Sequence, residues 1–244
     1  MLLSRSNPKL QKCTEYGYLS SGLMLSPSTS SHIIDLCRFK TPGCDAGCLN
    51  TAGMGGIPKH KDGLFLNEVQ QARYMRTQYF KFARKEFIKD LKREIYNHVK
   101  YSEKKGLVPV VRLNTLSDIL WEKVAPSIFT TFPDVQMYDY TKYPAKYRRN
   151  LPNNYHLTFS RAETETNQLE AYNWLSAGRP ISVVFDTKKG QPLPLEFMGQ
   201  KVVDADLHDL TFLHAKKGLV LGLRAKGRAK KDTSGFVVNT DGLI

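Results

Sequence analysis

From residue 108 onward the sequence alternates between short apolar runs, typical of buried strands, and stretches with helical spacing. The predicted strands cover residues 108–114, 135–140, 155–159, 181–185, 202–205 and 218–223. The predicted helices cover residues 118–129, a short segment ending at 149, and residues 166–177. Repeated strand–helix units pair their strands in parallel through right-handed crossovers. The pattern therefore predicts an α/β fold, with either an open sheet or a barrel.

The remaining segments show no internal repeat and no domain boundary, so we predict a single domain over residues 1–244. Residues 1–15 are interpreted as a polar lead-in, and residues 16–25 as the first strand. One long helix is predicted over residues 64–104, because apolar side chains recur there every three or four residues. Its apolar face consists of Phe80, Ala83, Phe87, Leu91, Ile95 and His98. The C-terminal segment 224–244 begins with a basic stretch that we expect to be exposed.

Three of the four cysteines lie in one loop, residues 37–56. Six residues separate Cys37 from Cys44, and three separate Cys44 from Cys48. Proline and glycine beside them permit the irregular backbone that brings thiolates to one metal centre. Three thiolates leave one position open, which suits an iron–sulfur cluster with one free iron better than a closed structural zinc site. The alternative is that these are ordinary buried thiols.

Charge and cysteine content indicate the cellular compartment of the protein and the kind of partner it binds. The sequence has no apolar run long enough to span a membrane and no signal-peptide pattern, which predicts a cytoplasmic protein. In a reducing compartment, clustered cysteines are metal ligands more often than disulfides. A formal net charge of +13 predicts an anionic partner, most often nucleic acid.

Polar side chains follow most of the predicted strands at the point where each strand ends. In parallel α/β folds, ligands bind at the carboxyl ends of the strands. These polar residues are Asn114, Ser117, Asp118, Asp139, Thr141, Lys142, Ser160, Arg161, Asp186, Lys188, Asp204 and Asp206. Ser117 or Asp118 is also the predicted cap of the helix that follows.

The cysteine loop resembles two groups of proteins. Cysteine triplets after the first strand of a partial (β/α) barrel mark radical S-adenosylmethionine (SAM) enzymes, although their usual spacing is three residues and then two. A closer resemblance is to phage proteins of the gene-product-eighty-eight type. It rests on Cys37, on TPGC at 41–44 and CLNTAG at 48–53, and on the later stretches RLNTLSDILWE, YDYTK, NYHLTFSR and SGFV.

This resemblance implies a radical-SAM-like partial (β/α) barrel of about six mostly parallel strands. It also implies a [4Fe–4S] cluster on Cys37, Cys44 and Cys48, with SAM on the fourth iron. An electron donor would reduce the cluster, and SAM cleavage would yield a 5′-deoxyadenosyl radical that attacks a substrate. A phage protein of this kind would act in the host cytoplasm.

Site residues follow from the same resemblance and from their places at the strand ends. Asn114, Ser117 and Asp118 are expected to hold the amino or ribose groups of SAM. Ser160 and Arg161 are expected to meet its carboxylate, since arginine offers a forked donor. Tyr140 and Lys142 are the candidate catalytic residues on the substrate side.

The partner prediction is DNA, RNA or a nucleotide, with no membrane. Basic residues in segments 81–92, 142–149 and 224–231 would contact phosphates, and Tyr138, Tyr140, Tyr143 and Tyr147 would stack on bases. The alternatives for these features are a solvated helix face and ordinary core packing.

Two other functions remain open from the sequence. In one, the three cysteines and a fourth ligand, which is His32, His60 or Cys13, form a tetrahedral zinc site that stabilises a nucleic-acid-binding protein. In the other, a non-enzymatic phage protein binds DNA or a host factor through its basic surface. We predict that Cys13 is not a ligand, because it lies outside the triplet and has no neighbouring glycines.

Overall fold

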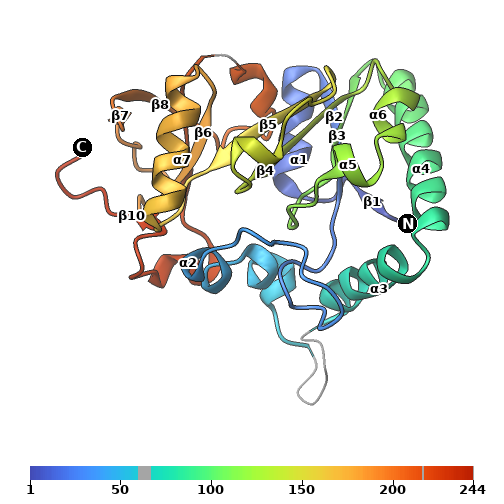
Figure 1. The fold of residues 1–244 in the computed structure, drawn as a ribbon, viewed down its shortest axis with the longest axis horizontal. Coiled ribbons are helices and arrows are strands. Elements are labelled where there is room, and N and C mark those ends of the chain that lie inside the picture. Colours follow the sequence, from blue (N-terminus) through green and yellow to red (C-terminus); the bar gives the residue numbers. More distant parts are fainter. Residues whose placement is uncertain (60–66, 216, 244) are drawn as a thin grey trace.

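A single open sheet runs through the protein (Figure 1). The computed structural model describes residues 1–59, 67–215 and 217–243, and ten strands form the sheet within these residues. The strands are β1 (Leu3–Ser4), β2 (Tyr18–Leu23), β3 (Val108–Arg112), β4 (Gln136–Thr141), β5 (Tyr155–Ser160), β6 (Ile181–Phe185), β7 (Glu196–Phe197), β8 (Gln200–Asp204), β9 (Val220–Arg224) and β10 (Val237–Val238).

Seven neighbouring strands form a continuous parallel set in the order β2-β3-β4-β5-β6-β9-β8. The short strands β1 and β7 pair antiparallel at the two ends, and β10 adds to β6 in parallel. The predicted α/β class and its parallel strands are confirmed. The sheet is open and has more strands than the six expected, and the radical-SAM type of partial barrel stays a prediction.

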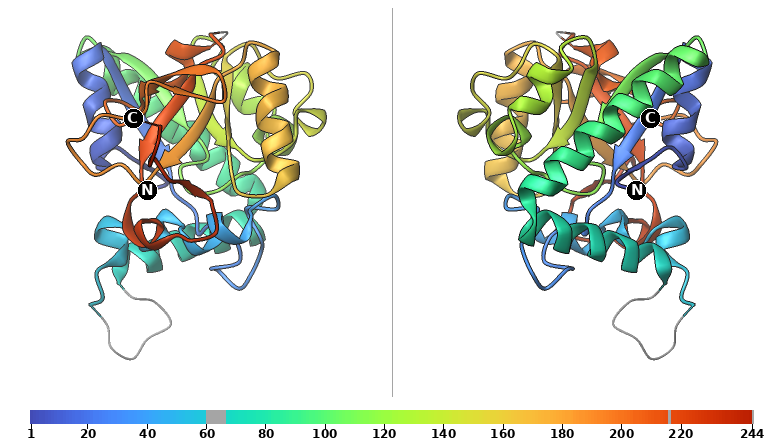
Figure 2. Two further views of the ribbon diagram at one scale, coloured as in Figure 1. Left: turned by 90° about the vertical axis from the view of Figure 1, so that its left-hand side faces the viewer. Right: turned by 90° about the vertical axis from the view of Figure 1, so that its right-hand side faces the viewer.

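Helices and short 3₁₀ segments surround this sheet. The α-helices are α1 (Pro8–Gln11), α2 (Pro42–Ala46), α3 (Glu68–Phe82), α4 (Arg84–Lys104), α5 (Trp121–Val124), α6 (Ser127–Thr131) and α7 (Glu165–Ser176). The 3₁₀ segments are Lys12–Tyr16, Leu49–Thr51, Gly53–Gly56, Ala145–Tyr147, Thr211–His214 and Gly227–Lys231. The layer that contains α2 and α3 lies across one end of the strands (Figure 2). In the described part of the chain, no helix is long and apolar enough to cross a membrane.

The two faces of the sheet differ because alternate residues of a strand point to opposite sides. One face is apolar and packs against the long helices in the main core, where Val111, Met137 and Leu157 are fully or nearly fully buried. The other face carries polar side chains, among them Ser20, Arg112, Tyr138 and Tyr140. It is covered by α1, the 3₁₀ segment behind it, and residues 208–214. The polar face therefore reaches the carboxyl ends of the strands beside the layer that contains α2.

The predicted helix over 64–104 is two helices, and its first three residues lie outside the described residues. Ala83 separates α3 from α4 with backbone angles φ −131° and ψ 55°. Phe80 and Phe87 would stand about 10.5 Å apart along a straight helix. Their ring centroids are 5.3 Å apart, and Phe80 also packs on Trp121 at 5.5 Å. The break thus lets the apolar face fold onto one aromatic cluster. The predicted burial of this face is confirmed except at Ala83, which is half-buried.

The predicted helix over 118–129 is also wrong in its details. Two short helices, α5 and α6, replace it, and neither Ser117 nor Asp118 caps them. Ala125 precedes Pro126 and takes φ −149° and ψ 62°. The ring of a proline disfavours the helical conformation of the residue before it, so one continuous helix cannot form.

Both chain ends are more structured than expected. Residues 1–15 are not a polar lead-in, because β1 extends the sheet and Leu2, Leu10 and Cys13 are buried. At the other end, Ala229 and Phe236 are buried and β10 pairs with β6. The basic C-terminal segment is therefore partly integrated in the fold.

Candidate functional site

The cysteine loop lies across the carboxyl ends of the parallel strands. Cys37 donates to the carbonyl of Leu116, just after β3, at 3.6 Å. Cys44 packs against the cluster formed by Ala162, Ala225, Ala229 and Phe236, which follow β5 and β9. Residues far apart in the sequence therefore hold the loop at the edge where ligands bind in parallel α/β folds.

Glu163 anchors the loop, and sequence reasoning did not single it out. Its carboxylate accepts from the hydroxyl of Thr41 at 2.8 Å and from the backbone N–H of Gly43 at 2.7 Å. Thr41 in turn caps α2 by accepting from the N–H of Cys44 at 3.3 Å. One carboxylate after β5 thus positions the short helix that carries Cys44.

Replacing Glu163 with glutamine is expected to release this loop. Glutamine removes the negative charge that accepts from both donors, and a hydrogen bond to a charged group contributes about 1.5–3 kcal/mol. Hydrogen exchange of residues 41–48 should accelerate, while exchange in β4 and β5 stays unchanged. Glu165→Gln, at the exposed start of α7, is the matched control. Equal protection of the loop in both variants would show that Glu163 does not anchor it.

The C-terminal segment forms the other wall of the loop. A Cβ atom on Gly43 would overlap Ser234 and lie 2.6 Å from Cβ of Phe236. A Cβ on Gly47 would lie 3.1 Å from that of Ala229. Glycine is required at position 43 because no side chain fits between the loop and this wall.

The three thiols of the loop are free and influence one another. Burial raises the pKa of Cys37 to about 12, and the nearby charges of Asp118, Cys48 and Cys44 add to the shift. Burial also raises the pKa of Cys48, with a further contribution from Cys44. All four cysteines of the chain are unpaired. The three thiols of the loop therefore lie in one partly buried region of the protein.

These thiols do not meet at a single point. Among residues 1–59, 67–215 and 217–243, no group of three or more His, Cys, Asp or Glu side chains is arranged to hold a metal ion. Two thiolates on one zinc ion lie about 3.8 Å apart, because Zn–S bonds are ~2.3 Å long and tetrahedral. Each thiolate of an iron–sulfur cluster binds a separate iron and stands farther from the others. Three cysteines on one loop are nevertheless the kind of donors that an iron–sulfur cluster takes, with one position left open.

The fourth ligands considered for zinc lie apart from the triplet or outside the described residues. Cys13 is fully buried among Val110, Tyr138 and Leu210 on the polar face of the sheet. His32 is exposed in a turn. His60 lies outside the described residues.

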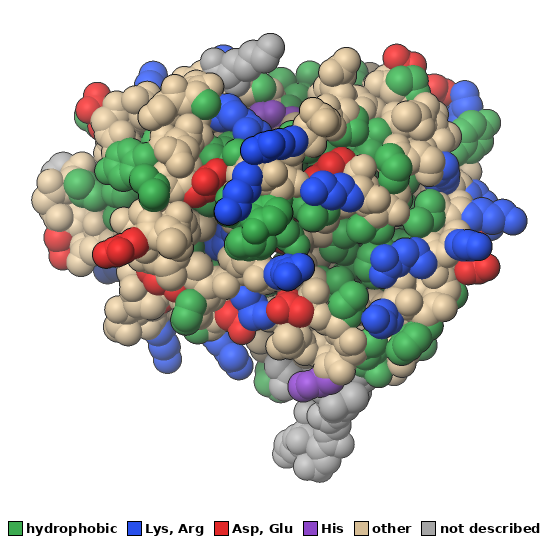
Figure 3. All heavy atoms as spheres, in the orientation of Figure 1, with side chains coloured by type: hydrophobic (Ala, Val, Ile, Leu, Met, Phe, Trp, Pro, Cys, Tyr) green, Lys and Arg blue, Asp and Glu red, His purple; other side chains and the backbone are tan. Residues whose placement is uncertain are grey.

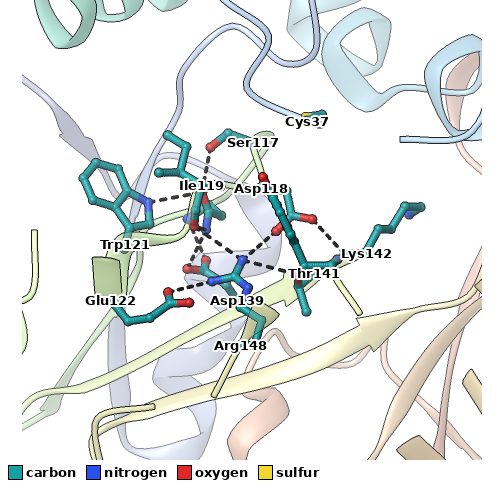
Figure 4. A network of polar contacts seen from close by, with 12 residues as sticks. Cys37, Ser117, Asp118, Ile119, Trp121, Glu122, Asp139, Thr141, Lys142 and Arg148 are labelled. Carbon is teal, nitrogen blue, oxygen red and sulfur yellow. Dashed lines mark hydrogen bonds and ion pairs between the residues drawn. The ribbon is translucent and has the colours of Figure 1, made fainter. Parts of the chain in front are cut away.

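The three residues assigned to the SAM amino or ribose groups use their side chains within the protein (Figure 4). Asn114 accepts from Ser117, from the N–H of Ile119 and from the indole of Trp121, at 2.9–3.1 Å. The amide of Asn114 also donates to Asp139 at 3.3 Å. This buried network fixes the loop after β3, and it gives the predicted role in SAM binding no support.

Asp118 belongs to a buried ion-pair network around Arg148. The guanidinium of Arg148 lies 2.7 Å from Asp118 and 2.8 Å from Glu122, and its side chain is fully buried. The other carboxylate oxygen of Asp118 accepts from the N–H of Lys142 at 2.7 Å. Arg148 therefore ties the loops after β3 and β4 together.

The candidate catalytic residues Tyr140 and Lys142 both lie at the carboxyl end of β4. The guanidinium of Arg112 lies over the ring of Tyr140, 4.8 Å from the ring centroid. The hydroxyl of Tyr140 is 3.4 Å from the ammonium of Lys9. Lys142 donates to the hydroxyl of Ser160 at 2.8 Å and lies over the ring of Phe236 at 5.4 Å. Within the described chain Lys142 has no acidic partner, so its charge is available beside the cysteine loop.

Ser160 and Arg161 do not act on one group together. Successive residues of a strand point to opposite faces. Ser160 meets Lys142, whereas Arg161 donates to the backbone carbonyl of Gly235 and lines a separate cavity of about 330 Å³ with Tyr172 and other side chains. Ser160 and Arg161 therefore face different parts of the protein.

The basic and aromatic residues expected to contact nucleic acid are dispersed. Tyr138 is buried and shares a 2.7 Å hydrogen bond with Ser20. Tyr143 packs on Phe39 at 4.6 Å, and Tyr147 alone among the four tyrosines is exposed, at 39%. Lysine and arginine side chains on the face shown in Figure 3 alternate with acidic and hydrophobic ones. Nucleic acid stays a prediction from net charge.

A second residue that the sequence did not reveal lies against the loop. Arg73 of α3 donates to the backbone and side-chain oxygens of Asn50 at 2.9 and 2.8 Å, two residues after Cys48. Its position in a basic, polar helix gave no signal, since only the tertiary structure brings α3 against the glycine-rich turn, residues 53–56.

Comparison with known proteins gives one match. A sequence model described as gene product 88 matches residues 1–240. No curated protein and no solved structure shows a significant match to the chain. The matched region includes the cysteine loop, its anchor Glu163 and every strand of the sheet. The chain therefore belongs to the gene product 88 family of phage proteins.

Proposed function

We propose that this protein binds a [4Fe–4S] cluster through Cys37, Cys44 and Cys48 and uses it as a radical SAM enzyme. The observation that carries the proposal is the anchored loop itself. It presents three free thiols on one loop at the carboxyl end of seven parallel strands. When bound, such a cluster supplies the electron that cleaves the sulfonium bond of SAM, and an external one-electron donor restores it.

The residues of this chain would bind and orient the cluster and SAM, and they would exclude water from the site. Glu163 and the 227–238 segment hold the cysteine loop in place. The ion pair of Asp118 with Arg148 fixes the segment after β3 that lies beside Cys37. Lys142 is the best candidate to meet the SAM carboxylate, because the partners of its ammonium among the described residues are the hydroxyl of Ser160 and the ring of Phe236. Tyr140 is the aromatic side chain on the substrate side, and nucleic acid or a nucleotide is the proposed substrate class.

Anaerobic reconstitution with iron and sulfide tests the proposal. We expect about four irons and four sulfides per chain, and 5′-deoxyadenosine from SAM after reduction with dithionite. Lys142→Met should weaken SAM binding in calorimetry and leave the iron content unchanged, with exposed Lys146→Met as control. A protein that binds zinc but no sulfide would favour the zinc alternative. A reconstituted cluster that neither binds nor cleaves SAM would overturn the enzyme function and leave the cluster.

A further inference from the structure

A buried arginine stands beside the cysteine loop with no acidic partner in the described part of the chain. Arg73 is 7% exposed, and among the described residues it forms no ion pair with Asp or Glu. Its Nε has no hydrogen-bond partner within residues 1–59, 67–215 and 217–243. Burying a charge without a counter-charge is strongly unfavourable, so retaining one indicates that an anion balances it in the functional protein.

The surroundings of Arg73 place its charge near Cys48. Nη1 of Arg73 donates to the backbone and side-chain oxygens of Asn50, which lies two residues after Cys48. A Cβ atom on Gly55 would lie 2.8 Å from Nη1 of Arg73, so glycine there makes room for the guanidinium. Burial lowers the pKa of Arg73 and raises the pKa of Cys48, and the charge of each group partly opposes the shift of the other.

We infer that Arg73 is the counter-charge of the cluster held by the cysteine loop and raises its reduction potential. The inference rests on the proposed cluster. A four-iron core with two positive charges and three thiolate ligands has a net charge of about −1, and one electron from the donor makes it about −2, with no bond formed or broken. A fixed positive charge favours the more negative form, so Arg73 makes reduction easier.

Redox titration of the reconstituted protein tests this inference. In Arg73→Gln the reduction equilibrium should fall about tenfold, a shift of about 59 mV to more negative potential for a one-electron couple. Arg73→Lys keeps the charge and should stay close to the original potential. Arg76→Gln removes a half-buried guanidinium of α3 that donates to the carbonyl of Met24 rather than to the loop, and should shift the potential much less.

A second variant guards against loss of the fold. Asn50→Asp is isosteric, keeps the acceptor for Arg73 and places a carboxylate against the guanidinium. It should lower the potential in the same direction as Arg73→Gln without removing the arginine. Loss of the cluster in Arg73→Gln with retention in Arg73→Lys would also support the inference, because the charge would then be needed for assembly.

The outcomes separate this inference from the proposed function. If the unmodified protein takes up no iron and sulfide, the proposed cluster is wrong and the role of Arg73 falls with it. If the cluster assembles in every variant and Arg73→Gln and Asn50→Asp leave its potential unchanged, the cluster stands and the inference about Arg73 is overturned. An equal shift in Arg76→Gln would also overturn it, since the effect would then not be specific to the residue beside the loop.

Discussion

Replacing Arg148 with methionine is expected to lower the free energy of unfolding by about 3–5 kcal/mol, which is the usual cost of removing one partner from a buried ion pair. Methionine has a similar length but no charge, and it would leave Asp118 and Glu122 facing each other without a cation. The side chain of Glu122 is only 3% exposed, so water cannot replace the lost partner. Urea denaturation followed by circular dichroism would measure the change.

The neighbouring residue provides the control for this prediction. Arg149 is exposed, and Arg149→Met should change the unfolding free energy by no more than about 0.5 kcal/mol. A loss below about 1 kcal/mol in Arg148→Met would show that the ion-pair network contributes little. The result also bears on nucleic-acid binding, because Arg148 cannot contact a phosphate while it is buried between two carboxylates.

Changing any one cysteine of the loop to alanine is expected to abolish assembly of the cluster, whereas Cys13→Ala should retain it. Each of Cys37, Cys44 and Cys48 would hold a separate iron, so one missing thiolate leaves the core incompletely ligated. Cys13 packs instead among Val110, Tyr138 and Leu210. Iron and sulfide per folded chain would be measured after anaerobic reconstitution.

The four variants discriminate between kinds of centre. Iron and sulfide that persist at the original level in a loop variant would remove that cysteine from the ligand set. Equal loss in all four would require a fold in which Cys13 leaves its pocket and joins the loop. Cys13→Ala also has an independent effect, since emptying a fully buried position lowers stability without touching the centre.

The strands were predictable because their signal is local. Apolar runs such as 181–185 are buried on both faces of a parallel sheet, and the turns between them carry glycine or proline. The burial of Phe87, Leu91 and Ile95 followed from helical spacing in the same way. The break at Ala83 was not predictable from spacing, because it accompanies tertiary contacts of Phe80 with Phe87 and Trp121 that no local pattern shows.

The same distinction between local sequence signals and tertiary contacts applies to the candidate site. The sequence by itself determined the family-typical cysteine loop, its glycine-rich turn and the polar residues at the strand ends, because these are properties of neighbouring residues. Only the tertiary structure decided which of those polar residues are free. It engages Asn114 and Asp118 in buried networks and leaves Lys142 without an acidic partner in the described chain. It also brings Glu163 and Arg73 to the loop from about 120 and 23 residues away. Such contacts arise from strand order and helix packing, and no local pattern encodes them.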